Sequence, residues 1–185
     1  GTNMVIIGYQ AGLANMTSAA GGTVAVGLGA LGALTSGASN VAVGLQALLL
    51  EDTNSENTAV GTQALATQNG ADGNTALGFR AGYDLTTGGG NTFLGAESGS
   101  NIVGGADNVI IGKGAGATTT AGLNMVLIGR SAGQSGDITS DATGAVAIGY
   151  QSLNALTSGA GNTAVGYQSL DALTGSGQNT AIGYG

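Results

Sequence analysis

The sequence predicts an all-β protein folded as a parallel β-solenoid, in which each coil of the chain stacks one short strand on the next. Three observations support this fold class. A glycine recurs about every 17 residues along the 185-residue chain, and β-branched or aliphatic residues alternate just before it. The chain has 38 glycines but no proline, which argues against collagen and polyproline segments. A fixed period of this length is typical of repeat architectures.

The recurring glycine, called the marker glycine below, defines the repeats. The spacing is 17 residues except in the first and eighth intervals, which measure 19 and 20. We therefore expect about eleven coils in one repeat domain over residues 1–185, with longer surface turns near 13–22 and 135–144. Because the chain starts and stops inside a repeat, we also expect it to be a segment of a longer fibre. The marker glycines are Gly8, Gly27, Gly44, Gly61, Gly78, Gly95, Gly112, Gly129, Gly149, Gly166 and Gly183.

A three-residue strand pattern precedes every marker glycine. The first and third residues of the strand are Val, Thr, Ile or Leu, the alternation of a strand with one buried face, so we expect them to face the coil's core. The middle residue is also apolar, and a strand that is apolar on both faces is buried on both. A 17-residue coil has little left to cover the second face, so we expect another copy of the chain to cover it. The predicted oligomer interface is Ala42, Ala59, Ala76, Phe93, Ile110, Ala147, Ala164 and Ala181.

The second half of each repeat is less regular. The third residue after the marker glycine is Ala or Ser, and the fourth is either Leu or Gly. These residues are compatible with a second short strand or with a single helical turn, and the pattern does not choose between them. The remaining residues are mostly Thr, Ser, Gly, Asn and Asp, which favour turns.

Composition excludes several classes of function. The net charge is −7 and the only cations are Arg80, Lys113 and Arg130, so no basic footprint for nucleic acid is present. No apolar run approaches the ~18 residues of a transmembrane helix, so membrane insertion is not expected. The chain has no cysteine and no histidine, which removes disulfides, thiolate metal sites and histidine-based nucleophilic catalysis. We expect neither a cofactor nor enzyme activity.

Three kinds of ligand site were weighed against structural roles. The ten carboxylates gather in no single column and suit turns better than a catalytic pair, although the cluster Glu51, Asp52 and Glu56 leaves a calcium site open. Thr alternates with Val in a column expected to face the core, which argues against a threonine array of the ice-binding kind. Tyr150, Tyr167 and Tyr184 follow three consecutive marker glycines, and this ladder either stabilises the solenoid or contacts a glycan.

Two phrases resemble the repeats of bacteriophage tail-fibre proteins: NTAVGTQAL at 57–65 and NTAVGYQSL at 162–170. The phrases at 3–8 and 124–129 are similar to the shorter head repeat of trimeric autotransporter adhesins. The resemblance extends over all eleven repeats and implies a left-handed β-roll with three chains side by side. One departure concerns the asparagine that opens the phrase, which is replaced by Met4, Thr23, Met125 and Ala145.

These observations lead to one functional hypothesis and two alternatives. The chain is expected to form the shaft of a phage tail fibre or spike, a stiff rod that presents a host-receptor-binding tip. The first alternative is a bacterial trimeric surface adhesin or extracellular filament, and the second is a glycan depolymerase. The expected partners are further copies of the chain and a host-surface glycan, and the expected location is the virion or the cell surface.

Overall fold

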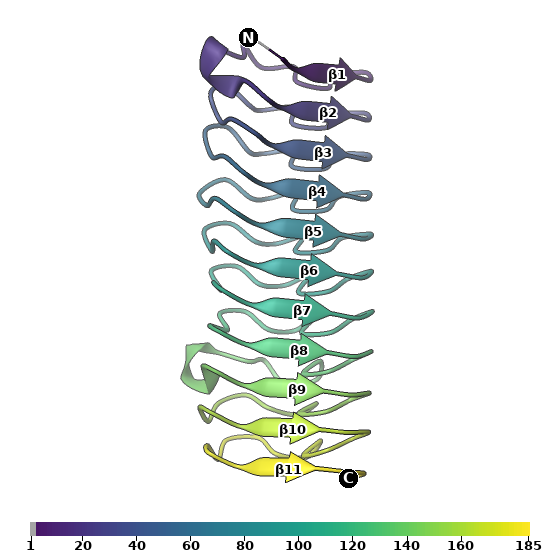
Figure 1. Cartoon of the computed structure of the whole chain (residues 1–185), viewed down its shortest axis with the longest axis vertical. Coiled ribbons are helices and arrows are strands. Elements are labelled where there is room, and N and C mark those ends of the chain that lie inside the picture. Colours follow the sequence, from purple (N-terminus) through teal and green to yellow (C-terminus); the bar gives the residue numbers. More distant parts are fainter. Residues whose placement is uncertain (1–2) are drawn as a thin grey trace.

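The computed structural model describes residues 3–185 as a single stack of coils (Figure 1). Eleven strands form one sheet in which every strand pairs in parallel with the next strand along the chain. Equivalent residues lie opposite one another throughout, as in Thr58↔Thr75 and Ala59↔Ala76. The prediction of an all-β parallel solenoid is therefore confirmed.

Each strand has three residues and ends at the residue before a marker glycine. The strands are β1 (Val5–Ile7), β2 (Val24–Val26), β3 (Val41–Val43), β4 (Thr58–Val60), β5 (Thr75–Leu77), β6 (Thr92–Leu94), β7 (Val109–Ile111), β8 (Val126–Ile128), β9 (Val146–Ile148), β10 (Thr163–Val165) and β11 (Thr180–Ile182). The marker glycines turn the chain out of the strand with φ between 126° and 145°, a region that L side chains rarely adopt. A Cβ on Gly44 would also lie 2.5 Å from the carbonyl oxygen of Gly61 in the next coil, so only glycine fits this corner.

The two longer repeats lengthen the same turn, the one that precedes a strand. Each contains a 3₁₀ helix, η1 (Ser18–Ala20) before β2 and η2 (Ser140–Ala142) before β9, and both protrude from the same side of the stack (Figure 1). Thr17 and Thr139 cap these helices with their side-chain oxygens. The longer turns expected near 13–22 and 135–144 contain η1 and η2, and the strand register continues across both.

The second limb of the coil is neither a regular strand nor a helix. It is a series of turns joined to the next coil by backbone hydrogen bonds, such as Leu48 N–H to the Ala64 carbonyl (3.1 Å) and Leu65 N–H to the Ala81 carbonyl (3.0 Å). Leu48 and Leu65 have positive φ values of 48° and 49°. The stacking of neighbouring coils holds these residues in a conformation that short peptides avoid.

The two faces of the sheet are the reverse of the prediction. The middle residue of the strand points into the coil, and Ala42, Ala59, Ala76, Phe93, Ile110, Ala147 and Ala164 have no exposed surface in the single chain. Ala181, in the last coil, is partly buried at the same position. These residues belong to the chain's own core, so the predicted oligomer interface was wrong. Alternation separates two faces, but it does not identify the inner one when both are apolar.

Residue size explains why the middle column is inside. Where the middle residue is alanine, the second limb usually contributes a buried leucine, as in the pairs Ala42–Leu48 and Ala59–Leu65. Where the middle residue is large, the leucine is replaced by glycine. A Cβ on Gly116 would lie 3.2 Å from Ile110 Cδ1. Between the middle strand residue and the fourth residue after the marker glycine, a coil therefore usually holds one large side chain, supplied by either limb.

A ladder of buried asparagines ties the turns together. In the run Asn40, Asn57, Asn74, Asn91 and Asn108, each Oδ1 accepts a hydrogen bond of 2.9–3.1 Å from the backbone N–H one coil later. Each Nδ2 donates to a carbonyl 14 residues further on. The position before the strand lacks asparagine only at β1, β2, β8 and β9, the strands on either side of the two longer turns. There the chain between coils follows a different path. The four departures from the repeat phrase thus have a common structural cause.

The exchange of large residues between the limbs predicts a compensating pair of substitutions. We expect Leu65→Gly to lower the free energy of unfolding by about 2–5 kcal/mol through cavity formation, and Ala59→Ile to lower it by about 1–3 kcal/mol through overpacking. The double variant rebuilds the Ile110–Gly116 arrangement, so its loss should be smaller than the sum by at least about 1 kcal/mol. Urea denaturation of the wild type, the two single variants and the double variant measures this coupling. Additive losses would contradict the idea that the two limbs exchange one large side chain.

Candidate functional site

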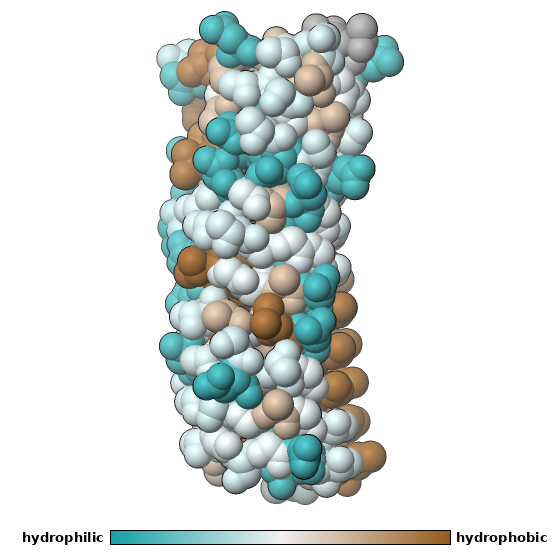
Figure 2. Space-filling view, turned by 90° about the vertical axis from the view of Figure 1, so that its left-hand side faces the viewer, coloured by the Kyte–Doolittle hydropathy of each residue, from teal (hydrophilic) through white to brown (hydrophobic). Residues whose placement is uncertain are grey.

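The outward face of the sheet is apolar along the whole stack. It consists of the first and third residues of the strands, and the largest exposed side chains in it are Val5, Ile7, Leu77, Leu94, Ile148 and Ile182, with 36–78% of their surface accessible. Figure 2 views the turn side of the stack and shows hydrophobic side chains projecting in a row from the edge where the sheet lies. Soluble monomers rarely expose contiguous apolar patches larger than a few hundred Å², so this face is the first candidate for an interaction surface.

Threonines in the sheet face outward, contrary to the prediction that they face the core. Thr58, Thr75 and Thr92 occupy the first strand position in successive coils. The run ends at Val109 and resumes only at Thr163. The third strand position is aliphatic in every coil. The property that continues along the face is therefore apolar character, not a hydroxyl array.

Tyr150, Tyr167 and Tyr184 form a stacked ladder at the corner after β9, β10 and β11. Successive ring centroids are 5.1 Å apart, with interplanar angles of 24° and 6°. The guanidinium of Arg130 lies 5.8 Å from the centroid of the Tyr150 ring. Most ring faces therefore contact one another and cannot stack on a sugar ring, whereas the ring edges remain open. Tyr167 is 45% exposed and Tyr184 81%.

Glu51 is the one carboxylate that sequence reasoning placed wrongly. It was grouped with turn residues, yet its side chain has no exposed surface. Glu51 stands seven residues after its marker glycine, where the preceding coil has the core residue Leu34, the following coil the buried Gln68 and the one after that Leu85. Its Oε1 accepts a 2.6 Å hydrogen bond from Asn54 N–H, and its Oε2 accepts a 3.2 Å bond from Gln68 Nε2. Alignment of the repeats would have revealed this core position.

Burial raises the pKa of Glu51, because desolvation disfavours the charged carboxylate more than its hydrogen bonds with Asn54 stabilise it. The Oε1 of the neighbouring Gln68 is buried without a hydrogen-bond partner. Within residues 3–185 no three carboxylates converge as metal ligands would. The calcium site that the sequence left open therefore has no support at the Glu51 cluster.

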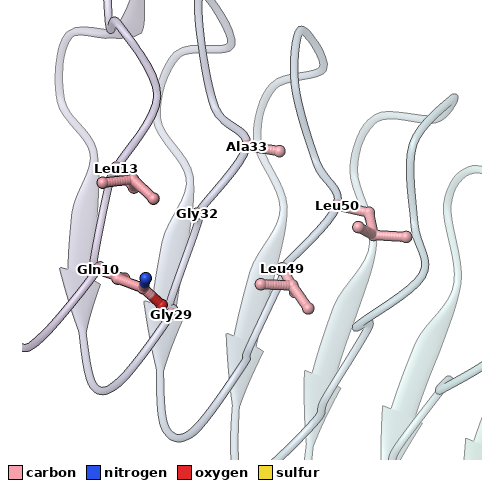
Figure 3. A pocket seen from close by; sticks show the side chains of 7 residues that line it. All are labelled: Gln10, Leu13, Gly29, Gly32, Ala33, Leu49 and Leu50. Carbon is pink, nitrogen blue, oxygen red and sulfur yellow. The ribbon is translucent and has the colours of Figure 1, made fainter.

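An open hollow of about 250 Å³ lies on the second limbs of the first three coils. Figure 3 shows Leu13, Leu49 and Leu50 around it, with Gly29 and Gly32 at its floor. The hollow exists because these two glycines interrupt columns that carry side chains in the flanking coils. Its volume is below the ~300–1,000 Å³ typical of small-molecule sites, and its lining offers a single polar side chain, Gln10.

The remaining expectations concern charge and membranes. Asp72 organises a turn as expected, because its Oδ1 accepts a 2.7 Å hydrogen bond from Ser55 N–H. Arg80 is held by Gln63, through a 2.9 Å hydrogen bond, and lies near the rings of Phe79 and Tyr83. In residues 3–185 no helix has the length and apolar character needed to cross a membrane.

The buried Glu51 predicts a specific pH dependence of stability. A carboxyl group whose pKa is raised on folding adds no penalty below its unfolded pKa of about 4.3, and it destabilises the fold progressively as the pH rises through its folded pKa. Glu51→Gln removes this charge, so the variant should gain stability over the wild type as the pH rises from 4 to 8. Parallel urea denaturation curves across this range measure the difference. Identical pH profiles would show that the carboxylate is not desolvated, and Asp72→Asn serves as an exposed control.

Comparisons with known proteins do not assign a family to this chain. No protein-family model matches the chain, no curated protein matches it, and no solved structure matches it.

Proposed function

We propose that this chain is a shaft segment of a phage tail fibre or spike, in which three copies pack side by side as left-handed β-rolls. The observation that carries the proposal is the apolar outer sheet face, which runs the length of a stack whose own core is already complete. The resemblance of the repeat phrases to tail-fibre repeats supports a phage as the source. The resemblance to the head repeats of trimeric autotransporter adhesins supports the left-handed coil and the three copies. The function is mechanical: the rod holds a receptor-binding tip away from the particle.

The coil geometry suits a stiff spacer. Ten strand-to-strand steps of about 4.8 Å give a rod of roughly 48 Å. Every coil is joined to the next on both limbs by backbone hydrogen bonds, and the asparagine ladder adds side-chain bonds between turns. Bending such a rod would stretch hydrogen bonds along one side of it. A bending force on the rod is therefore distributed over the hydrogen bonds between all coils and is not concentrated at a hinge.

The size of the sheet face fits an interface between copies. Three residues of about 3.3 Å across and ten steps of about 4.8 Å give a projected area of roughly 500 Å². The exposed corner residues Leu28, Leu45 and Phe79 border this face and extend it toward the ~800 Å² per partner of a standard stable interface. A second copy presents the same pattern of columns, so ridges and grooves of the two faces share one spacing.

Two alternatives use the same rod. A bacterial surface adhesin or extracellular filament would need the same covered sheet face, and the sequence on either side of the segment would distinguish it from a phage fibre. Particle-attachment and chaperone domains indicate a phage, whereas a signal peptide and a membrane anchor indicate an adhesin. A glycan depolymerase would need two carboxylates positioned about 5–10 Å apart, and release of oligosaccharide products by this segment would support it.

Substitution of the sheet face tests the assembly. The wild-type chain should have the mass of a trimer by light scattering, and Leu77→Glu should convert it to monomers because a charge cannot be desolvated at the centre of an apolar interface. Leu50→Glu is the matched control, since Leu50 on the second limb is 47% exposed and Leu77 is 48% exposed. It should leave the trimer intact. A monomeric wild type, or equal dissociation by both variants, would overturn the proposed assembly.

A further inference from the structure

We infer that Lys113, Arg130 and the tyrosine ladder form one binding strip for a linear anionic polysaccharide that lies along the rod. The five residues Lys113, Arg130, Tyr150, Tyr167 and Tyr184 each follow a marker glycine in five successive coils, β7 to β11. The strip continues the corner column that carries Leu28, Leu45 and Phe79 in earlier coils, so the inference requires that an interface between copies leave this corner open from β7 to β11.

Backbone hydrogen bonds fix the order of the strip. Ser131 N–H donates to the Lys113 carbonyl (3.1 Å), Gln151 N–H to the Arg130 carbonyl (3.2 Å) and Gln168 N–H to the Tyr150 carbonyl (2.8 Å). Each strip residue is therefore one coil, about 4.8 Å, from the next. The two cations are direct neighbours, and the aromatic rings continue the same line toward β11.

The charge of the strip is unusual for this molecule. The chain has a net charge of −7 and only three cations, yet two of them occupy adjacent coils of one column. Lys113 and Arg130 are exposed, and no carboxylate in residues 3–185 lies within 4.0 Å of either. Two like charges one coil apart repel each other without a compensating anion. An anionic ligand would supply that compensation.

Several groups along the strip are already ordered. Arg130 lies over the Tyr150 ring, which holds the guanidinium at the corner. The next column carries Gln151 and Gln168, whose side-chain amides form a parallel ladder through a 3.0 Å hydrogen bond from Gln168 Nε2 to Gln151 Oε1. The nearest acidic residue in that column is Glu97, one coil before Lys113. A ligand on the strip therefore meets fixed groups, which lowers the entropic cost of binding.

The chemistry of the strip selects the ligand. Lys113 and Arg130 would bind carboxylate or sulfate groups by charge-assisted hydrogen bonds. The phenolic hydroxyls of the tyrosine ladder and the amides of Gln151 and Gln168 would bind sugar hydroxyls. The stacked rings point their edges outward, so the ligand contacts the ring edges as it runs along the ladder and does not insert between the rings. Two cations are too few for the phosphate density of a nucleic acid. An extended acidic glycan matches both the sparse charge and the row of neutral polar groups.

Binding of defined polymers to the full chain tests the inference. The probes are polygalacturonate and a heparin-type sulfated oligosaccharide, with dextran and a single-stranded oligonucleotide of similar length as comparisons, all measured by titration calorimetry. At least one acidic polysaccharide should bind, dextran and the oligonucleotide should bind at least tenfold more weakly, and added salt should weaken binding. Failure of both acidic polysaccharides to bind, or equal binding of the oligonucleotide, would overturn the inference.

Variants locate the site on the strip. Lys113→Gln and Arg130→Gln should each weaken binding about tenfold, the effect of losing one charge-assisted hydrogen bond. Tyr167→Phe should weaken it less and keep the ladder stacked. Arg80→Gln removes the third cation, which lies outside the strip beside Gln63, and it should leave affinity unchanged. Equal losses with Arg80→Gln would show that net charge alone attracts the polymer. Circular dichroism confirms that each variant keeps its fold.

Discussion

The parallel register between coils is the constraint on which the rest of the structure depends. Residues 17 apart lie opposite one another about 4.8 Å apart, so each position must tolerate a neighbour like itself. Glycine meets this condition at the corner, where Gly61 and Gly78 approach backbone to backbone. Asparagine meets it in the turn by bonding to the next asparagine, and tyrosine meets it at the corner by stacking. A column of like charges does not meet this condition, because the charges repel each other at this distance. This repulsion accounts for the scarcity of charged residues.

A second constraint follows from the first: every coil has the same small interior. Beside the sheet, one large side chain fills most coils, whether Leu48 from the second limb or Ile110 from the strand. Because the two limbs exchange this role, the sheet and the backbone path are the same in coils of quite different composition. Polar residues enter the core where a pair can stack, as Glu51 and Gln68 do, at the cost of a desolvated carboxylate.

Sequence reasoning predicted the repeat, the strands and the long turns, because these follow from spacing and from the alternation of apolar residues. It inverted the sheet, because Val60 and Ala59 are both apolar and alternation alone ranks neither as the inner residue. The useful signal was the covariation between the middle strand residue and the fourth residue after the marker glycine, as in Ala59 with Leu65 and Ile110 with Gly116. The core position of Glu51 was missed because its neighbours Asp52 and Thr53 are typical turn residues. Its column, the seventh residue after the marker glycine, was not compared between repeats.

The two 3₁₀ turns show where this architecture permits change. Both lengthen the turn that precedes a strand, both are anchored by one buried alanine, Ala20 or Ala142, and neither shifts the register of the sheet. The local adjustment is that another residue replaces asparagine at the position before each flanking strand. A lineage of such rods can therefore diversify by small insertions at one corner while its outer sheet face stays unchanged, and a protein engineer can graft foreign loops at the same corner.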